Sequence, residues 1–188
     1  MPLITLNSKS IFFIHIPKTG GSSLYSNLKD AGAKISFIRH KSIEKINRQH
    51  YHIELLEKHF PSFKKYKCFT IIRDPSSRLL SEYVWRTKDT EFKTLDKWFS
   101  TNLGKPYHCL DNHLRPQSDF VCDNVKTFLH KNYCEVEVFL TDFFNKDIDF
   151  SKKEKVFEYK RPQLKRHLSK ESFNKFKSIY KRDFKVFN

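Results

Sequence analysis

The sequence predicts an α/β fold of three layers, in which a central, mostly parallel sheet of four or five strands is flanked by helices. Short apolar runs of strand length alternate with longer segments whose apolar residues have helical spacing. Strands separated by helices imply a parallel sheet, because parallel pairing needs a crossover connection. The 188 residues are 38% hydrophobic and 15% aromatic and contain no low-complexity linker, so we expect one domain over residues 1–188.

Four apolar runs are short enough to be buried strands. The first ends just before Pro17 and the third just before Pro75, and proline cannot continue a strand. The predicted strands are Ile11–His15, Ile35–Arg39, Cys68–Ile72 and Val136–Leu140.

The segments between these runs have helical spacing and recognisable ends. Gly32 ends the first predicted helix, Pro61 closes the second, and Ser169 can cap the last, whose stripe of aromatic residues reads as core. Residues 103–119 carry glycine, proline and polar residues and are expected to form an irregular loop. The predicted helices are residues 22–31, 42–60 (as one helix or two), 76–88, a short one around 95–99, and one that starts after Ser169 and carries Phe173, Phe176, Tyr180 and Phe184.

The charge is strongly positive and uneven. The chain has 36 Lys and Arg against 21 Asp and Glu, a net charge of +15, and residues 151–188 alone contribute +9. Such a surface attracts polyanions: nucleic acid, an anionic membrane or a small phosphorylated ligand. No apolar run reaches the ~18 residues of a membrane span and no secretory signal is visible, so a cytosolic location is expected. The four cysteines form no CxxC pair, and we expect neither a disulfide nor a metal site.

The first predicted strand runs into the segment Pro17–Ser23, which is followed by a helix. Two adjacent glycines allow close approach to the backbone, and the helix N-terminus favours an anion. Lys18 adds a cation and the neighbouring hydroxyls add donors. The Walker A pattern of nucleotide kinases is not met, because the lysine precedes the glycines.

A second candidate anion site follows the third predicted strand. Arg73 comes at the carboxyl end of that strand, where open α/β sheets bind ligands. Ser81 lies about two turns into the next helix, so one phosphate could contact both residues.

Together the two segments resemble the sulfotransferases that use 3′-phosphoadenosine 5′-phosphosulfate (PAPS), which have a P-loop-like fold. The resemblance implies that the first segment binds the 5′-phosphosulfate and that Arg73 and Ser81 bind the 3′-phosphate. It further suggests that Lys160 and Arg161 close over the 3′-phosphate. It also implies that the desulfated nucleotide, PAP, is the product. The residues of the first segment are Lys18, Thr19, Gly20, Gly21, Ser22 and Ser23.

The carbohydrate-modifying branch of that family is the most similar, because residues 113–120 and 179–184 also look like its patterns. A carbohydrate acceptor is therefore expected, with no nucleic-acid partner. The sequence departs from the family in two ways: no acidic residue is obvious after the fourth predicted strand, and the membrane anchor usual in eukaryotic members is missing. A lysine-rich chain without that anchor suggests a bacterial source.

Sulfuryl transfer needs stabilisation of the leaving oxygen and a base for the acceptor hydroxyl. Lys18 and the helix N-terminus can stabilise the leaving oxygen without a metal. His40, directly after the second predicted strand, is the predicted base, and neutral histidine suits this role at cellular pH. His50 and His52 are weaker candidates, because a solvated helix face is the favoured explanation for them. His113, Arg115 and Gln117 are expected to line the acceptor cleft or to position the sulfuryl group.

Two other functions remain open from the residues alone. A non-enzymatic protein that binds nucleic acid or glycan through the basic C-terminal residues would explain the charge, although no zinc-finger, helix-turn-helix or RNA-recognition signature supports it. A P-loop kinase is disfavoured by the position of Lys18. The acceptor and the oligomeric state are not determined by the sequence.

Overall fold

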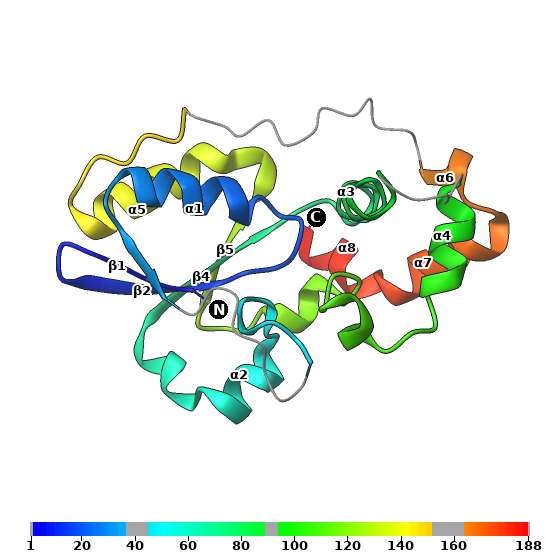
Figure 1. Ribbon diagram of the computed structural model, residues 1–188, viewed down its shortest axis with the longest axis horizontal. Helices are drawn as coiled ribbons and strands as arrows, with labels where there is room; N and C mark the ends of the chain where they lie inside the picture. Colours follow the sequence, from blue (N-terminus) through cyan, green and yellow to red (C-terminus); the bar gives the residue numbers. More distant parts are fainter. Residues whose placement is uncertain (1, 37–44, 89–93, 152–163, 188) are drawn as a thin grey trace.

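The computed structural model describes residues 2–36, 45–88, 94–151 and 164–187, and in these its sheet has five strands in the order β3-β1-β2-β4-β5 (Figure 1). Strands β2, β4 and β5 are parallel neighbours, whereas β1 is antiparallel to both β2 and β3. The predicted α/β fold with a mostly parallel sheet is thus confirmed. The strands are β1 (Leu3–Leu6), β2 (Lys9–Ile14), β3 (Lys34–Ser36), β4 (Lys67–Ile72) and β5 (Val125–Leu129).

Helices cover both faces of the sheet (Figure 1). The α-helices are α1 (Gly21–Asp30), α2 (Ile53–His59), α3 (Pro75–Thr87), α4 (Leu95–Asn102), α5 (Tyr133–Phe144), α6 (Leu164–His167), α7 (Lys170–Ile179) and α8 (Lys181–Phe187). The short 3₁₀ helices are η1 (Arg48–His50), η2 (Pro61–Lys65), η3 (Tyr107–Leu110), η4 (Gln117–Phe120) and η5 (His130–Asn132).

Two apolar clusters fill the spaces between sheet and helices, and a third joins the remaining helices. Leu24 of α1 and Leu140 of α5 pack with Phe13 and Phe69 of the sheet on one face. Residues of α2, η2 and η4 cover the opposite face. The third cluster, centred on Phe99, joins α3, α4, α6 and α7 beside the sheet, as Figure 1 shows.

The prediction of a strand at Val136–Leu140 is wrong, because these residues lie in α5. The alternating apolar residues suggested a strand, but Val136, Leu140 and Phe144 recur every fourth residue and form the buried stripe of a helix, while Val138 is 60% exposed. The strand that follows β4 in the sheet is instead β5. Neither β5 nor β1 was predicted from the sequence. The residues in which the family's acidic residue was expected, directly after the predicted fourth strand, therefore lie in a helix.

Two helix predictions also change in detail. The last predicted helix is divided into α7 and α8, which meet at Tyr180. Residues 42–60 contain η1 and α2 in their described part rather than one long helix. Residues 37–44, with the predicted base His40, lie outside the described residues.

The candidate loops begin at the carboxyl ends of two neighbouring strands. Ile14 of β2 pairs with Thr70 of β4, and the Thr70 hydroxyl donates to the Ile14 carbonyl at 2.7 Å. The segments that follow β2 and β4 therefore leave the sheet at one edge, as α/β ligand sites do. In the described part of the chain, none of the helices has both the length and the apolar character needed to cross a membrane.

Candidate active site

The loop after β2 has the backbone geometry of an anion cradle. Gly20 has φ of 95° and Lys18 has φ of 69°, a left-handed conformation that non-glycine residues adopt rarely and mostly at functional sites. Gly20 is the N-cap of α1 and offers no side-chain acceptor to the first turn, which also contains no acidic residue. The first N–H groups of α1 are therefore available to an anionic ligand.

The two loops are in direct contact. The Arg73 guanidinium donates to the Lys18 carbonyl at 3.1 Å, and the buried Arg78 guanidinium donates to the Pro17 carbonyl at 3.0 Å. The Gln117 side-chain amide accepts from the Arg73 N–H at 2.9 Å and donates to its carbonyl at 2.7 Å. The loops therefore lie together at one edge of the sheet, with Arg73 held between them.

The segment after η3 is attached to the same structure. Arg78 also donates to the backbone carbonyls of His113 (2.8 Å) and Arg115 (2.9 Å). The buried Asp183 carboxylate of α8 accepts from the N–H groups of Gln117 and Ser118, at 2.8 and 2.9 Å. These charge-assisted bonds fix the segment that carries His113 against the first loop.

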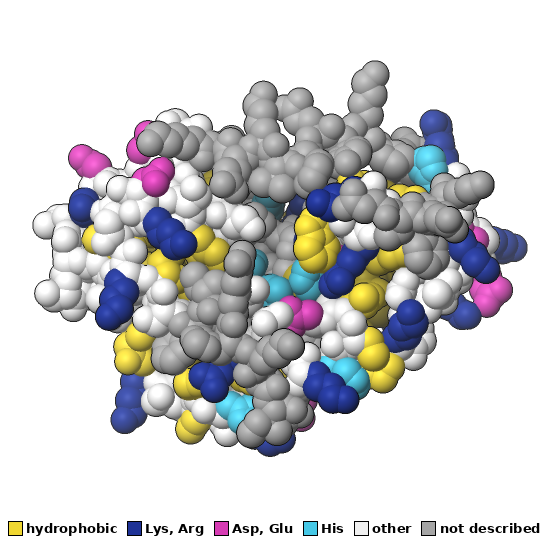
Figure 2. Space-filling model, in the orientation of Figure 1, with side chains coloured by type: hydrophobic (Ala, Val, Ile, Leu, Met, Phe, Trp, Pro, Cys, Tyr) yellow, Lys and Arg dark blue, Asp and Glu magenta, His cyan; other side chains and the backbone are white. Residues whose placement is uncertain are grey.

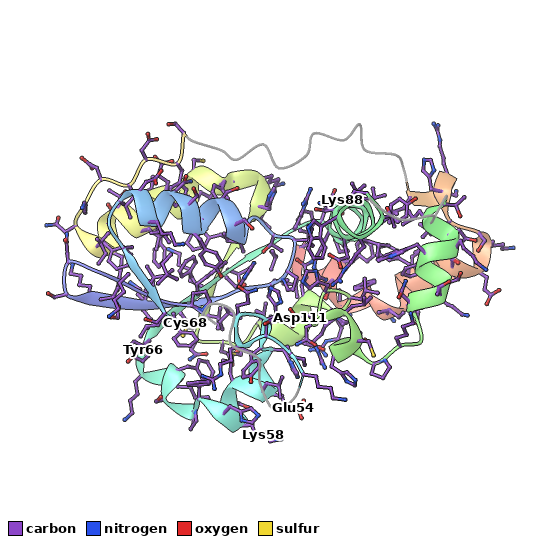
Figure 3. All side chains as sticks on the ribbon, in the orientation of Figure 1. Glu54, Lys58, Tyr66, Cys68, Lys88 and Asp111 are labelled. Carbon is purple, nitrogen blue, oxygen red and sulfur yellow. The ribbon has the colours of Figure 1, made fainter. Side chains whose placement is uncertain are left out.

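Two histidines at this edge each have a carboxylate partner. His113 Nδ1 donates to Glu82 of α3 at 2.6 Å, and the other Glu82 oxygen accepts from Arg86 at 2.8 Å. His50 Nδ1 donates to Asp111 at 2.8 Å. The rings of His50 and His113 meet edge to face, 4.9 Å apart. Figure 2 shows histidine side chains gathered in a hollow near the centre of this face, and Figure 3 labels Asp111 near the middle of the molecule, below α3.

Burial and pairing determine the charges of these groups. Burial alone would raise the pKa of Glu82, but the hydrogen bonds and charges of His113 and Arg86 outweigh it and lower the pKa to about 2. Burial lowers the pKa of His50 to about 4, and the hydrogen bond to Asp111 offsets this only in part. At neutral pH Glu82 is therefore ionised and His50 is neutral.

A third histidine, His15, lies at the end of β2 beneath the first loop. Its ring is 5.1 Å from that of His50, and its Nδ1 is hydrogen-bonded to the Tyr25 hydroxyl at 2.9 Å. Its other edge lies against Gly21, where an added Cβ would be only 2.2 Å from His15 Nε2. Burial is the main reason that the pKa of His15 is lowered well below its usual value, so the ring supports the loop as a neutral group.

An exposed tryptophan connects the first loop with His113. The Trp85 ring stacks on His113 with 5.5 Å between centroids, and the Lys18 ammonium lies 4.9 Å from the same indole. Burial lowers the pKa of Lys18; Glu82 opposes this, and the charges of Arg73 and Arg86 add to it. The indole therefore has a cation and an imidazole as neighbours at the mouth of the site.

One donor atom each from His50, Asp111 and His113 lies within 4.8 Å of the others. The Lys18 and Arg86 cations nearby, however, disfavour a divalent ion. We assign no metal site to these residues. Their convergence instead fits a small polar group such as a hydroxyl.

The other predicted site residues fall into three groups. Ser22 is exposed, and Ser23 and Ser81 are half-buried, so all three can reach a ligand. Thr19 is fully buried, and its hydroxyl donates to the Ile16 carbonyl at 2.8 Å. Arg115 forms an ion pair with Asp119 at 3.0 Å and lies over Tyr107. Two predicted residues, Lys160 and Arg161, lie outside the described residues.

The solvated helix face favoured for His50 and His52 is wrong. Both side chains are buried, each about 5% exposed, and His52 is within 3.3 Å of the Asn112 amide. The partners Glu82 and Asp111 were missed because they lie 31 and 61 residues from their histidines in the chain. The sequence Asp111-Asn112-His113 has a carboxylate two residues before a histidine, and this pattern is a signal that indicates the segment.

A profile of the sulfotransferase family matches residues 1–188. The chain belongs to the sulfotransferase family. No curated protein and no solved structure matches it significantly. The sulfotransferase is therefore an enzyme that transfers a sulfuryl group, and its family in general takes that group from PAPS.

The residues present fit this donor. The uncapped N-terminus of α1 and the Lys18 ammonium suit the 5′-phosphosulfate end. Arg73, in contact with the same loop, suits the second phosphate. A side chain at Gly20 would be both strained, at φ of 95°, and 3.2 Å from His130, so the cradle requires glycine there.

Proposed function

We propose that this sulfotransferase moves the sulfuryl group of PAPS to a hydroxyl of a carbohydrate by in-line displacement. The observation that carries the proposal is the contact between the Arg73 guanidinium and the Lys18 carbonyl, at 3.1 Å. The contact supports a shared nucleotide site, because it joins the segments that follow β2 and β4 at one edge of the sheet. Had the loops faced opposite sides, no single donor could occupy both.

Each loop has its own part in this proposal. Lys18 and the N–H groups of α1 bind the 5′-phosphosulfate and stabilise the charge that develops on the bridging oxygen. Ser22 and Ser23 add hydroxyl donors, while Thr19 contributes through its backbone because its hydroxyl is occupied. Arg73 and Ser81 bind the 3′-phosphate, and Lys160 and Arg161 are proposed to close over it.

The carbohydrate acceptor is proposed from the resemblance of residues 113–120 to the carbohydrate-modifying branch and from the polar character of the hollow. Asp111 and His113 offer hydrogen-bonding groups beside the Trp85 ring that stacks on His113, a mixture that suits a polyhydroxylated ring. Arg115 of the same segment is proposed to contact the acceptor from its position over Tyr107. Gln117 is buried with its amide bonded to Arg73, so we propose that it positions the arginine. His40 remains the base predicted from the sequence.

The test is transfer of labelled sulfate from PAPS to a panel of oligosaccharides, with PAP affinity measured by calorimetry. Lys18→Ala is expected to lower kcat by about 10²- to 10³-fold, as loss of a transition-state donor does. Arg73→Ala is expected to weaken PAP binding by at least about tenfold. Lys29→Ala, an exposed lysine of α1, is the matched control and should change neither.

Absence of both transfer and PAP binding in the unaltered protein would refute the proposal. Binding of nucleic acid or glycan that falls steeply with salt and ignores PAP would instead favour the polyanion-binding function, which the +9 charge of residues 151–188 suggests. Transfer only to hydroxyls of non-carbohydrate compounds would support sulfuryl transfer but refute the proposed carbohydrate acceptor.

A further inference from the structure

We propose that His113 is the base that takes the proton from the acceptor hydroxyl, and that the buried Glu82 is the positioning residue that holds it in the reactive tautomer. The inference rests on the proposed sulfuryl transfer to a hydroxyl. It assigns a role to Glu82, which lies between the predicted ligand Ser81 and Tyr83 and which no sequence pattern singled out.

The geometry determines which nitrogen of His113 is available. Glu82 is fully buried, and its two oxygens accept from His113 Nδ1 (2.6 Å) and Arg86 Nε (2.8 Å). An ionised carboxylate can only accept hydrogen bonds, so His113 must carry its proton on Nδ1. A neutral ring in this tautomer has its lone pair on Nε2, which is the form that a general base requires.

The position of His113 relative to the leaving group supports the same role. The centroid of the Trp85 ring lies 5.5 Å from that of the His113 ring and 4.9 Å from the Lys18 ammonium. The proposed base and the cation proposed to stabilise the leaving oxygen therefore contact the same indole, as groups that act on one substrate would.

The neighbouring His50 is less suited to this role although it also has a carboxylate partner. It is enclosed by His15 on one side and His113 on the other. Burial lowers its pKa to about 4, which makes it a weak base at neutral pH. The groups that face His113 from the elements packed against it are Glu82 and Arg86 of α3, His50 of η1, Asp111 of its own segment and, across Trp85, Lys18.

The step balances with the residues present and the two substrates. The acceptor oxygen forms a bond to sulfur while the bond between sulfur and the bridging phosphate oxygen breaks, and PAP leaves with the electron pair. The hydroxyl proton moves to Nε2 of His113. The resulting imidazolium is stabilised by the Glu82 carboxylate and returns its proton to water after product release.

The test compares Glu82→Gln and His113→Asn in the full chain, with Glu57→Gln as a matched control. Glu57 is an exposed glutamate of α2 and is paired with Lys64. His113→Asn is expected to lower kcat by about 10²- to 10⁴-fold. Glu82→Gln is expected to lower kcat by about tenfold or more, with PAP affinity within about twofold in both variants.

Rescue by the conservative variant separates a positioning role from a structural one. Glu82→Asp keeps the carboxylate but draws it back from His113, so kcat should return part of the way towards the native value. KM for the acceptor and PAP affinity should stay close to the native values in both Glu82 variants, whereas a general loss of structure would change all three quantities.

Several outcomes would overturn the inference. One is a His113→Asn protein that keeps kcat within about threefold; another is a Glu82→Gln protein that loses PAP affinity in step with kcat. Loss of transfer in His40→Asn with retention in His113→Asn would return the role to His40. In each case the unaltered protein still transfers sulfate, whereas failure of the proposed function would abolish transfer and PAP binding there. If Glu82→Gln does not fold, His113→Asn decides alone.

Discussion

Replacing Gly21 with alanine places a methyl group against the ring of His15. The added Cβ would lie 2.2 Å from Nε2, 2.6 Å from Cδ2 and 2.7 Å from Cε1 of that ring. Ordinary contacts between such atoms are about 3.5–4.0 Å, so ring or backbone must move by more than 1 Å. The ring cannot move freely, because it is bonded to Tyr25 and packed on Phe13 and His50.

The expected cost follows from overpacking at a buried site. Forcing extra atoms into a packed interior typically costs about 1–3 kcal/mol, and Gly21 and His15 are both buried. For a chain of this length, each kcal/mol lowers Tm by about 2–4 °C. Displacement of the first turn of α1 should also weaken PAP binding. Gly104→Ala is the control, because its Cβ would meet no atom within 4 Å and should change Tm little.

The assay is a double-mutant cycle measured by urea unfolding. His15→Ala removes the ring that the methyl group meets, so Gly21→Ala should cost about 1–3 kcal/mol in the native background and close to nothing in the His15→Ala background. If Gly21→Ala costs the same in both backgrounds, the clash is not the cause and the reasoning is refuted.

Two further predictions concern stability. Arg78→Met should lower the free energy of unfolding in urea by about 3 kcal/mol or more, because two buried backbone carbonyls and one partly buried carbonyl lose their donor. An Arg78→Met protein as stable as the parent would contradict this. The pKa of His50 is about 4 when folded against an ordinary 6.5, so protonation favours the unfolded chain and stability should fall as pH drops from about 6.5 to 4, by about 3 kcal/mol. Urea unfolding at pH 7 and pH 4.5 checks this, and His50→Asn should flatten the profile.

The parts of the fold that the sequence predicted correctly have strong local signals. Pro17 and Pro75 end β2 and β4 clearly, and Gly32 ends α1. The error at Val136–Leu140 came from a short apolar run, for which alternation and helical spacing look alike. The β1 strand was missed because it has only four residues and is defined by its antiparallel partners on both sides, β2 and β3.

The candidate site was predictable only where its residues lie in one loop. The first cradle is contiguous in the sequence, and Arg73 is placed by the end of a strand. The pairs of His113 with Glu82 and of His50 with Asp111 are formed by folding across 31 and 61 residues. His50 is a buried residue because η1 packs its ring against His15. Nothing in the neighbouring sequence indicates this burial.

The Asp183 carboxylate of α8 accepts from the backbone N–H groups of Gln117 and Ser118, close to the segment that carries His113. The sheet itself is built from residues 3–129 and contains no part of α8. Cleavage of the chain before α8 should therefore release the acceptor side of the site while the sheet stays folded.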